Sequence, residues 1–90
     1  MLVRRRFVIT GRVQGVGFRW FAHDAAVREG VDGWVRNLPD GRVEAEIEGD
    51  VEAVARVEAA LRRGPAASRI DSVDVDDCAP GGRRTGFSIR

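Results

Sequence analysis

A glycine-rich stretch near the start of the chain combines residue types that bind phosphate. Residues 11–19 read GRVQGVGFR, so Gly15 and Gly17 lie two positions apart and Arg19 closes the stretch. Glycines allow the unusual φ angles that aim successive backbone N–H groups at one point. A guanidinium adds a planar pair of donors that matches two phosphate oxygens. The stretch predicts an anion cradle, although it is equally compatible with an ordinary tight connection that leaves Arg19 in solvent.

The neighbouring segments would place this stretch between a strand and a helix. Residues 3–13 alternate Phe7 and Ile9 with arginines, as expected for a half-buried strand. From Phe18, apolar residues recur at helical spacing until Gly30, a natural left-handed stop. The unpaired N–H groups and the positive dipole end of this helix would reinforce the cradle.

The rest of the chain predicts a hairpin, a second helix and two more strands. Residues 33–37 and 43–48 alternate on either side of a Leu-Pro-Asp-Gly turn. Asp50 is a typical N-cap for a helix that stops at Gly64. Further strands are expected near residues 70–75 and 87–89.

The predicted element order is β-α-β-β-α-β followed by a short extra C-terminal strand. Two short helices can cover only one face of a sheet. We therefore predict an α+β, ferredoxin-like two-layer sandwich, with two helices on one face of a mainly antiparallel sheet. A chain of 90 residues with one modest core predicts a single domain, residues 1–90. Many unrelated functions use this fold, so it does not decide the function.

Composition excludes several classes of function. The 15 basic residues, all arginine, oppose 14 acidic residues, so no overall field would attract nucleic acid. A lone cysteine, Cys78, excludes an internal disulfide and suits a reducing compartment. No apolar run approaches the ~20 residues of a membrane span. We expect a cytoplasmic protein that does not associate with membranes.

A second segment completes a specific pattern. Residues 33–44 read GWVRNLPDGRVE, in which Asn37, the one asparagine, precedes the turn, while the one glutamine, Gln14, lies in the glycine loop. Together the two segments resemble the signature segments of the acylphosphatases. The resemblance spans residues 11–44, and the remainder is similar in length and element order, including the ending at residues 86–90.

This resemblance implies hydrolysis of an acyl phosphate to a carboxylate and inorganic phosphate with no metal or other cofactor. We expect the protein to be monomeric or weakly associated. In the family, the arginine that closes the loop binds the phosphoryl group with loop amides, and the asparagine before the turn positions the attacking water. These catalytic roles would fall to Arg19 and Asn37. Inorganic phosphate or sulfate would compete with the substrate. The implied substrate-binding residues are Gln14, Gly15, Val16, Gly17, Phe18 and Arg19.

The implied reaction suits the residues present. An acyl phosphate expels a carboxylate, whose conjugate acid has a pKa of about 4, so no general acid is required. Amides and a guanidinium stabilise the charge spread over the phosphoryl oxygens. A carboxylate base would repel the substrate and is not needed.

Several side chains have other interpretations. Gln14 could stabilise the loop instead of binding substrate. His23 could be a base, but a histidine on an amphipathic helix usually lies at the core boundary. Asp74 and Asp76 share one strand face and favour a solvated edge over a metal site. Trp20 could belong to the core or to a rim.

Two other functions are alternatives. A non-catalytic acylphosphatase-like domain could hold phosphate or carbamoyl phosphate and act through a partner. A nucleic-acid-binding module is favoured only by the arginines at 4–6, and it would need exposed aromatic residues on central strands, whereas Phe7 lies on the apolar face. One departure from the family concerns the end of the chain, where tyrosine is common but Arg90 stands here. We interpret it as a change in packing.

Overall fold

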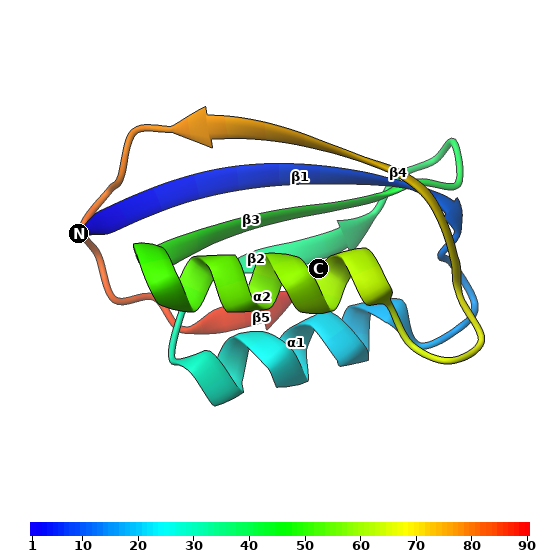
Figure 1. Ribbon diagram of the computed structural model, residues 1–90, viewed down its shortest axis with the longest axis horizontal. Helices are drawn as coiled ribbons and strands as arrows, with labels where there is room; N and C mark the ends of the chain where they lie inside the picture. Colours follow the sequence, from blue (N-terminus) through cyan, green and yellow to red (C-terminus); the bar gives the residue numbers. More distant parts are fainter.

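Two layers make up the fold, a five-stranded sheet and two helices on one of its faces (Figure 1). This computed structural model describes residues 1–90. Its elements are β1 (Leu2–Arg12), α1 (Phe18–Glu29), β2 (Asp32–Asn37), β3 (Val43–Asp50), α2 (Val51–Arg63), β4 (Arg69–Cys78) and β5 (Phe87–Ile89). The strand order is β4-β1-β3-β2-β5, in which only the pairing of β2 with β5 is parallel. The predicted ferredoxin-like α+β fold is confirmed.

The hairpin and α2 form where the sequence marks them. The Leu38 N–H donates to the Arg42 carbonyl at 2.8 Å and closes the turn between β2 and β3. Asp50 caps α2, because its carboxylate accepts the Glu52 backbone N–H at 3.2 Å. Neither helix is long and apolar enough to cross a membrane.

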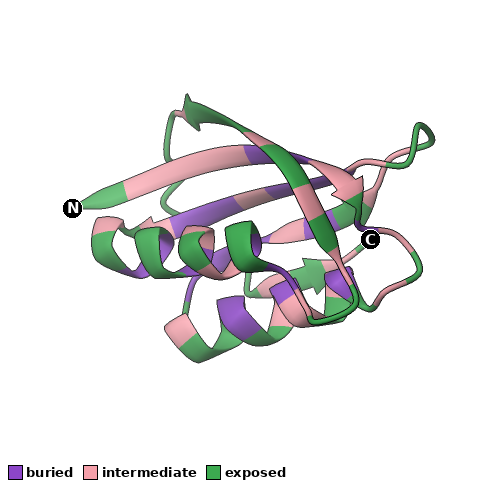
Figure 2. Cartoon of the chain, turned by 45° about the vertical axis from the view of Figure 1, so that its right-hand side comes forward, coloured by how far each residue is buried: buried purple, intermediate pink, exposed green.

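One hydrophobic core fills the space between the helices and the sheet (Figure 2). Phe7 and Ile9 of β1 are fully buried in it, as are Val54 and Leu61 of α2. Burying a side chain of this size contributes roughly 1.5–3 kcal/mol. This core fixes β1, β2 and α1 relative to one another, and the loop after β1 lies at their junction.

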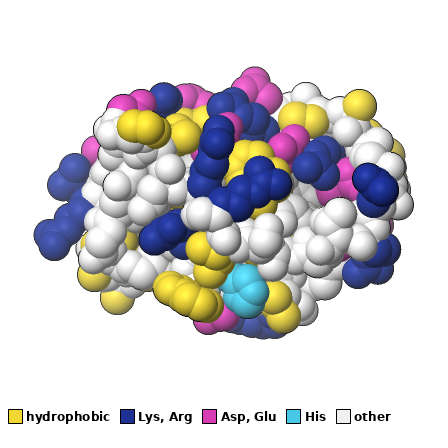
Figure 3. Space-filling view, turned by 180° about the vertical axis from the view of Figure 1, so that it is seen from behind, with side chains coloured by type: hydrophobic (Ala, Val, Ile, Leu, Met, Phe, Trp, Pro, Cys, Tyr) yellow, Lys and Arg dark blue, Asp and Glu magenta, His cyan; other side chains and the backbone are white.

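Ion pairs occupy the sheet face that the helices leave open, where arginines gather (Figure 3). Glu44 is only 3% exposed and accepts hydrogen bonds from both Arg6 and Arg36. Burial alone would raise the pKa of Glu44, but the two guanidiniums outweigh it and hold this pKa below its usual value. The alternation of glutamates on β3 predicted an outward face. It did not predict this burial, which depends on arginines supplied by the strands on both sides.

Glu48 fastens the segment before β5 to the sheet. The backbone N–H groups of Gly81 and Gly82 donate to its two carboxylate oxygens at 2.6 and 2.8 Å, and Arg4 donates at 3.2 Å. The hydrogen bond from Gly81 lowers the pKa of Glu48 most and, with the others, outweighs the effect of burial. Because the pKa of Glu48 is lower in the folded than in the unfolded protein, its carboxylate stabilises the fold at pH values above the unfolded-state pKa. This stabilisation is lost as the pH falls through the folded-state pKa.

We expect Glu48→Gln to lower the urea midpoint of unfolding at neutral pH, because a neutral amide replaces a charged acceptor. The gap to the wild type should narrow below about pH 4, where the wild-type carboxyl is protonated as well. Urea titrations across this pH range measure the effect. Asp74→Asn, at an exposed aspartate of β4 outside these ion pairs, is the matched control. A difference between the two urea midpoints that stays constant down to acidic pH would contradict the stabilising role of the Glu48 carboxylate.

Candidate active site

The loop between β1 and α1 has the backbone shape of an anion cradle. Gly15 and Gly17 adopt left-handed φ angles of 73° and 78°, which other residues rarely take. A Cβ at either position would meet no other atom within 4 Å. Conformation, and not lack of room, therefore requires glycine here, and the space above both positions stays open.

The first turn of α1 presents unpaired backbone N–H groups beside this loop. The first helical hydrogen bond runs from the Phe21 N–H to the Gly17 oxygen, at 3.0 Å. The N–H groups of Phe18, Arg19 and Trp20 therefore have no helical acceptor. No acidic residue lies in this turn and no side chain caps it. The positive end of the helix dipole is thus available to an anion.

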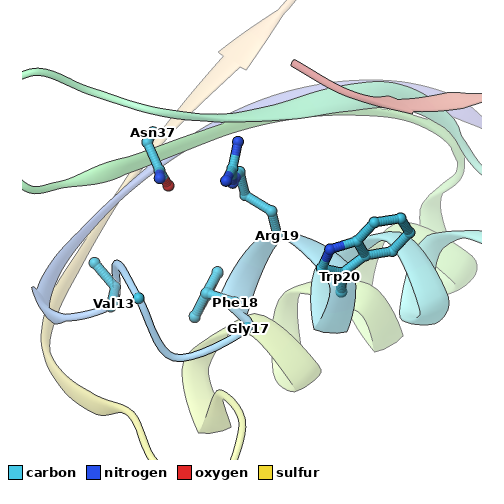
Figure 4. Close-up of a pocket in the computed structure, with 7 residues that line it drawn as sticks. Val13, Gly17, Phe18, Arg19, Trp20 and Asn37 are labelled. Carbon is cyan, nitrogen blue, oxygen red and sulfur yellow. The ribbon is translucent and has the colours of Figure 1, made fainter.

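A pocket of about 170 Å³ lies over the loop (Figure 4). The Arg19 side chain rises into it from the start of α1, and the Asn37 side chain points into it from the end of β2. The lining contains no acidic residue, so nothing in it repels a phosphoryl group. The pocket is lined by Val13, Gly15, Gly17, Phe18, Arg19, Trp20 and Asn37.

A main-chain oxygen orients the Arg19 guanidinium. Its Nη1 donates to the Arg90 oxygen at 3.1 Å. Arg90 is held in turn, because its N–H donates to the Val35 oxygen at 2.8 Å and its guanidinium lies 4.5 Å from the centroid of the Trp34 ring. Arginine has five N–H donors, so the rest of the Arg19 fork is free for an anion. The sequence, in which Arg90 indicates only a change in packing, does not predict this contact, because Arg19 and Arg90 lie 71 positions apart.

Gln14 connects the loop to the hairpin that carries Asn37. Its Nε2 donates to the Leu38 oxygen at 2.7 Å and to the Arg42 oxygen at 3.0 Å. Both acceptors belong to the turn that directly follows Asn37. These hydrogen bonds set the separation between the loop and the asparagine. They favour the interpretation of the Gln14 side chain as a loop stabiliser.

Comparisons with known proteins show the family of this chain. The family model described as acylphosphatase matches residues 5–89. An acylphosphatase of Anaeromyxobacter dehalogenans is 53% identical over 98% of this chain and 95% of that protein. This chain belongs to the acylphosphatase family. The acylphosphatase family, the hydrolase class and the acylphosphatase function predicted from the sequence are confirmed.

Solved structures of acylphosphatases have the same fold. The crystal structure of acylphosphatase from Bacillus subtilis is similar with a TM-score of 0.93 and 37% identity, over 100% of this chain and 99% of that one. HypF from T. kodakarensis is similar with a TM-score of 0.81 and 31% identity, and all of this chain matches 12% of that larger protein. The acylphosphatase fold thus occurs both as a protein of this size and as a part of a larger one.

The acylphosphatase pocket contains most of the residues predicted from the sequence. Of the residues predicted to bind substrate, all except Gln14 and Val16 line it, and Asn37 lines it too. Val16 instead packs against the hydrophobic core. The roles given to Arg19 and Asn37 stay predictions.

Two lining residues of the acylphosphatase pocket had no predicted role. Val13 is 1% exposed and joins the pocket to the core, whereas Trp20 is 66% exposed and lies at the rim. His23, the alternative base, does not line the pocket. Its ring lies between those of Trp20 and Phe87, with centroids 6.1 Å from each.

Proposed function

We propose that the protein hydrolyses acyl phosphates in the pocket over the glycine loop, with Arg19 and Asn37 as catalytic residues. The loop and the first turn of α1 would supply the N–H groups that hold the phosphoryl oxygens. One observation carries the proposal: a guanidinium and an amide side chain converge over left-handed glycines in a pocket that no carboxylate lines.

In the proposed reaction a water molecule attacks phosphorus while the bond between phosphorus and the acyl oxygen breaks. The electron pair of that bond leaves with the carboxylate, and both water protons end on the phosphate, which then equilibrates with solvent. Asn37 orients the water. Arg19 and the backbone amides stabilise the charge on the phosphoryl oxygens. The carboxylate leaves without protonation because its conjugate acid has a pKa of about 4.

Hydrolysis of benzoyl phosphate in the presence of EDTA tests the proposal. We expect saturable, enzyme-dependent release of phosphate that added Mg²⁺ does not raise, because amides and Arg19 supply the positive charge. Release no faster than the spontaneous reaction would overturn the assigned activity. Turnover lost in chelator and restored by metal would overturn the metal-free mechanism.

Inorganic phosphate and sulfate are expected to inhibit competitively against the acyl phosphate, because both are tetrahedral anions that fit the same cradle. Initial rates at several substrate concentrations measure the pattern of inhibition. Sodium chloride at equal ionic strength is the control for general screening of charge. Inhibition that high substrate does not relieve would place the anion site elsewhere.

A non-catalytic domain that only holds phosphate or carbamoyl phosphate is the alternative. The match to a small part of HypF shows that the fold also occurs inside a larger protein, and it does not favour this alternative. Holding an anion requires the cradle and Arg19 alone. The Asn37 side chain, which points into the same pocket from another element, supports hydrolysis. Phosphate binding without benzoyl phosphate turnover would favour the alternative.

We further propose that residues 1–90 form a single acylphosphatase-like domain that acts as a cytoplasmic monomer and binds no nucleic acid. One hydrophobic core supports the single domain, and the free thiol of Cys78 suits a reducing compartment. Each of Arg4, Arg5 and Arg6 forms ion pairs with carboxylates of other elements, which leaves little free charge for RNA. Light scattering tests the monomer, and a salt-dependent shift of labelled RNA would contradict the last point.

A further inference from the structure

We propose that Trp20 contacts the acyl part of the substrate and makes the site favour aromatic and other large apolar acyl phosphates. The inference rests on the proposed function, since it requires the phosphoryl group to occupy the glycine loop. It extends that function because the cradle itself recognises only the phosphoryl end.

Trp20 is an exposed aromatic side chain at the edge of the pocket. It follows Arg19 in α1, lines the pocket, and is 66% exposed. When an aromatic ring packs against an aromatic or other apolar group, the burial of apolar surface and the contact between rings both stabilise the complex. Val13 and Phe18, the other apolar residues of the lining, are 1% and 2% exposed and form its inner side. Trp20 is therefore the apolar surface left for the outer part of a substrate.

The size of the pocket places the acyl group outside the cradle. Its volume of about 170 Å³ is smaller than the roughly 300–1,000 Å³ of pockets that enclose a whole drug-sized ligand. The polar part of the lining, from the glycines to Arg19 and Asn37, suits the phosphoryl group. A large acyl group must then extend past the rim.

The in-line geometry of phosphoryl transfer places the acyl group on the side of Trp20. In phosphoryl transfer, the attacking and leaving oxygens lie roughly in line on opposite sides of phosphorus. Asn37 lies on one side of Arg19, and the Trp20 ring lies on the other (Figure 4). A water held by Asn37 therefore expels the acyl oxygen on the side of the indole ring.

Neighbouring rings support Trp20 in this position. The His23 ring meets the indole edge-on, with centroids 6.1 Å apart, one helical turn further along α1. On its other side His23 lies against Phe87 of β5, at 6.1 Å and 58°. Figure 3 shows hydrophobic side chains on either side of the one histidine. The indole is thus the end of a short aromatic row and presents an exposed ring to a bound acyl group.

A comparison of two substrates tests the proposal. kcat/KM is measured for benzoyl phosphate and acetyl phosphate, and their ratio cancels changes in the shared phosphoryl chemistry. We expect Trp20→Ala to lower the ratio by about 3- to 10-fold, as loss of an aromatic contact implies. Trp20→Phe should keep the ratio within about twofold of the wild type, since a ring remains. Inhibition by inorganic phosphate should be unchanged in both variants.

The matched control is Val27→Ala, which shortens a 58% exposed apolar side chain of α1 that does not line the pocket. It should leave the ratio unaltered. An unchanged ratio in Trp20→Ala, with acetyl phosphate still hydrolysed, would overturn the role of Trp20 and leave the proposed function intact. Equal losses on both substrates with weaker phosphate inhibition would also overturn it, because Trp20 would then shape the cradle. Failure of the wild type to hydrolyse either substrate would instead reject the proposed function.

Discussion

Arg19→Ala is expected to lower kcat/KM for benzoyl phosphate by about 10³- to 10⁵-fold, the range that a guanidinium contributes to phosphoryl transfer elsewhere. Arg19 is the one basic side chain that lines the pocket, and it donates there to the Arg90 oxygen and forms no ion pair with an aspartate or glutamate side chain. Its charge is therefore available to the phosphoryl group. Each charge-assisted hydrogen bond lost should cost about 1.5–3 kcal/mol, in the ground state as well as in the transition state.

Phosphate binding should consequently fail together with turnover. A ligand that binds only the folded state raises the unfolding temperature. Thermal scans with and without inorganic phosphate should show this protection in the wild type and little of it in Arg19→Ala. Arg28→Ala, on an exposed position of the same helix, is the matched control and should keep both activity and protection. Full phosphate protection in a folded Arg19→Ala variant would show that the anion binds elsewhere.

Much of the fold follows from local patterns in the sequence. Period-two alternation and helical spacing find the strands and helices, and the turn after Asn37 and the cap at Asp50 mark the limits of β2, β3 and α2 within two residues. The strand expected near residues 70–75 is longer than predicted, since β4 continues to Cys78. These signals work because each depends on neighbours in the chain. The loop could be predicted for the same reason, since the left-handed angles at Gly15 and Gly17 are a local property.

Contacts between distant positions could not be predicted in this way. The hydrogen bond from Arg19 to the Arg90 oxygen joins residues 71 positions apart, and those from Gln14 to the hairpin span 24 and 28 positions. They exist only because the sheet places β5 and the hairpin beside the loop. The position of Trp20, which the sequence left open between core and rim, is likewise decided by the packing of α1, which leaves it at the rim.

Ion pairs on the sheet face that the helices leave open explain why a chain with 15 arginines has only one candidate anion site. Arg4 pairs there with Glu46 and Glu48, and Arg6 and Arg36 share Glu44. Because Glu44 and Glu48 are buried, dissolved salt screens these ion pairs only partly. Arg19 lies away from these ion pairs, in the pocket over the glycine loop, and no aspartate or glutamate lines that pocket. The pocket thus contains a guanidinium without an acidic side chain in its lining, although the formal net charge of the chain is only +1.

Asn37→Ala is expected to lower kcat by roughly 10²- to 10³-fold, the effect of losing one preorganised hydrogen-bonding group at a reacting centre. Unlike Arg19, Asn37 contributes no charge, and it reaches the pocket from β2 instead of from the loop. Its proposed partner is the attacking water, and no attacking water takes part when inorganic phosphate is bound. Inhibition by phosphate should therefore stay within about twofold of the wild type, a change worth less than the ~1.4 kcal/mol of a tenfold effect.

Steady-state kinetics and phosphate-dependent thermal scans on Asn37→Ala and Arg19→Ala separate the two roles, once circular dichroism has shown that both variants are folded. Asn37→Asp adds a second contrast, because a carboxylate keeps the size of the side chain but repels the phosphoryl group. This variant should lose phosphate protection as well as turnover. Asn37→Ala should lose turnover alone. If it lost phosphate protection as fully as Arg19→Ala, or kept near wild-type kcat, Asn37 would not be the residue that positions the water.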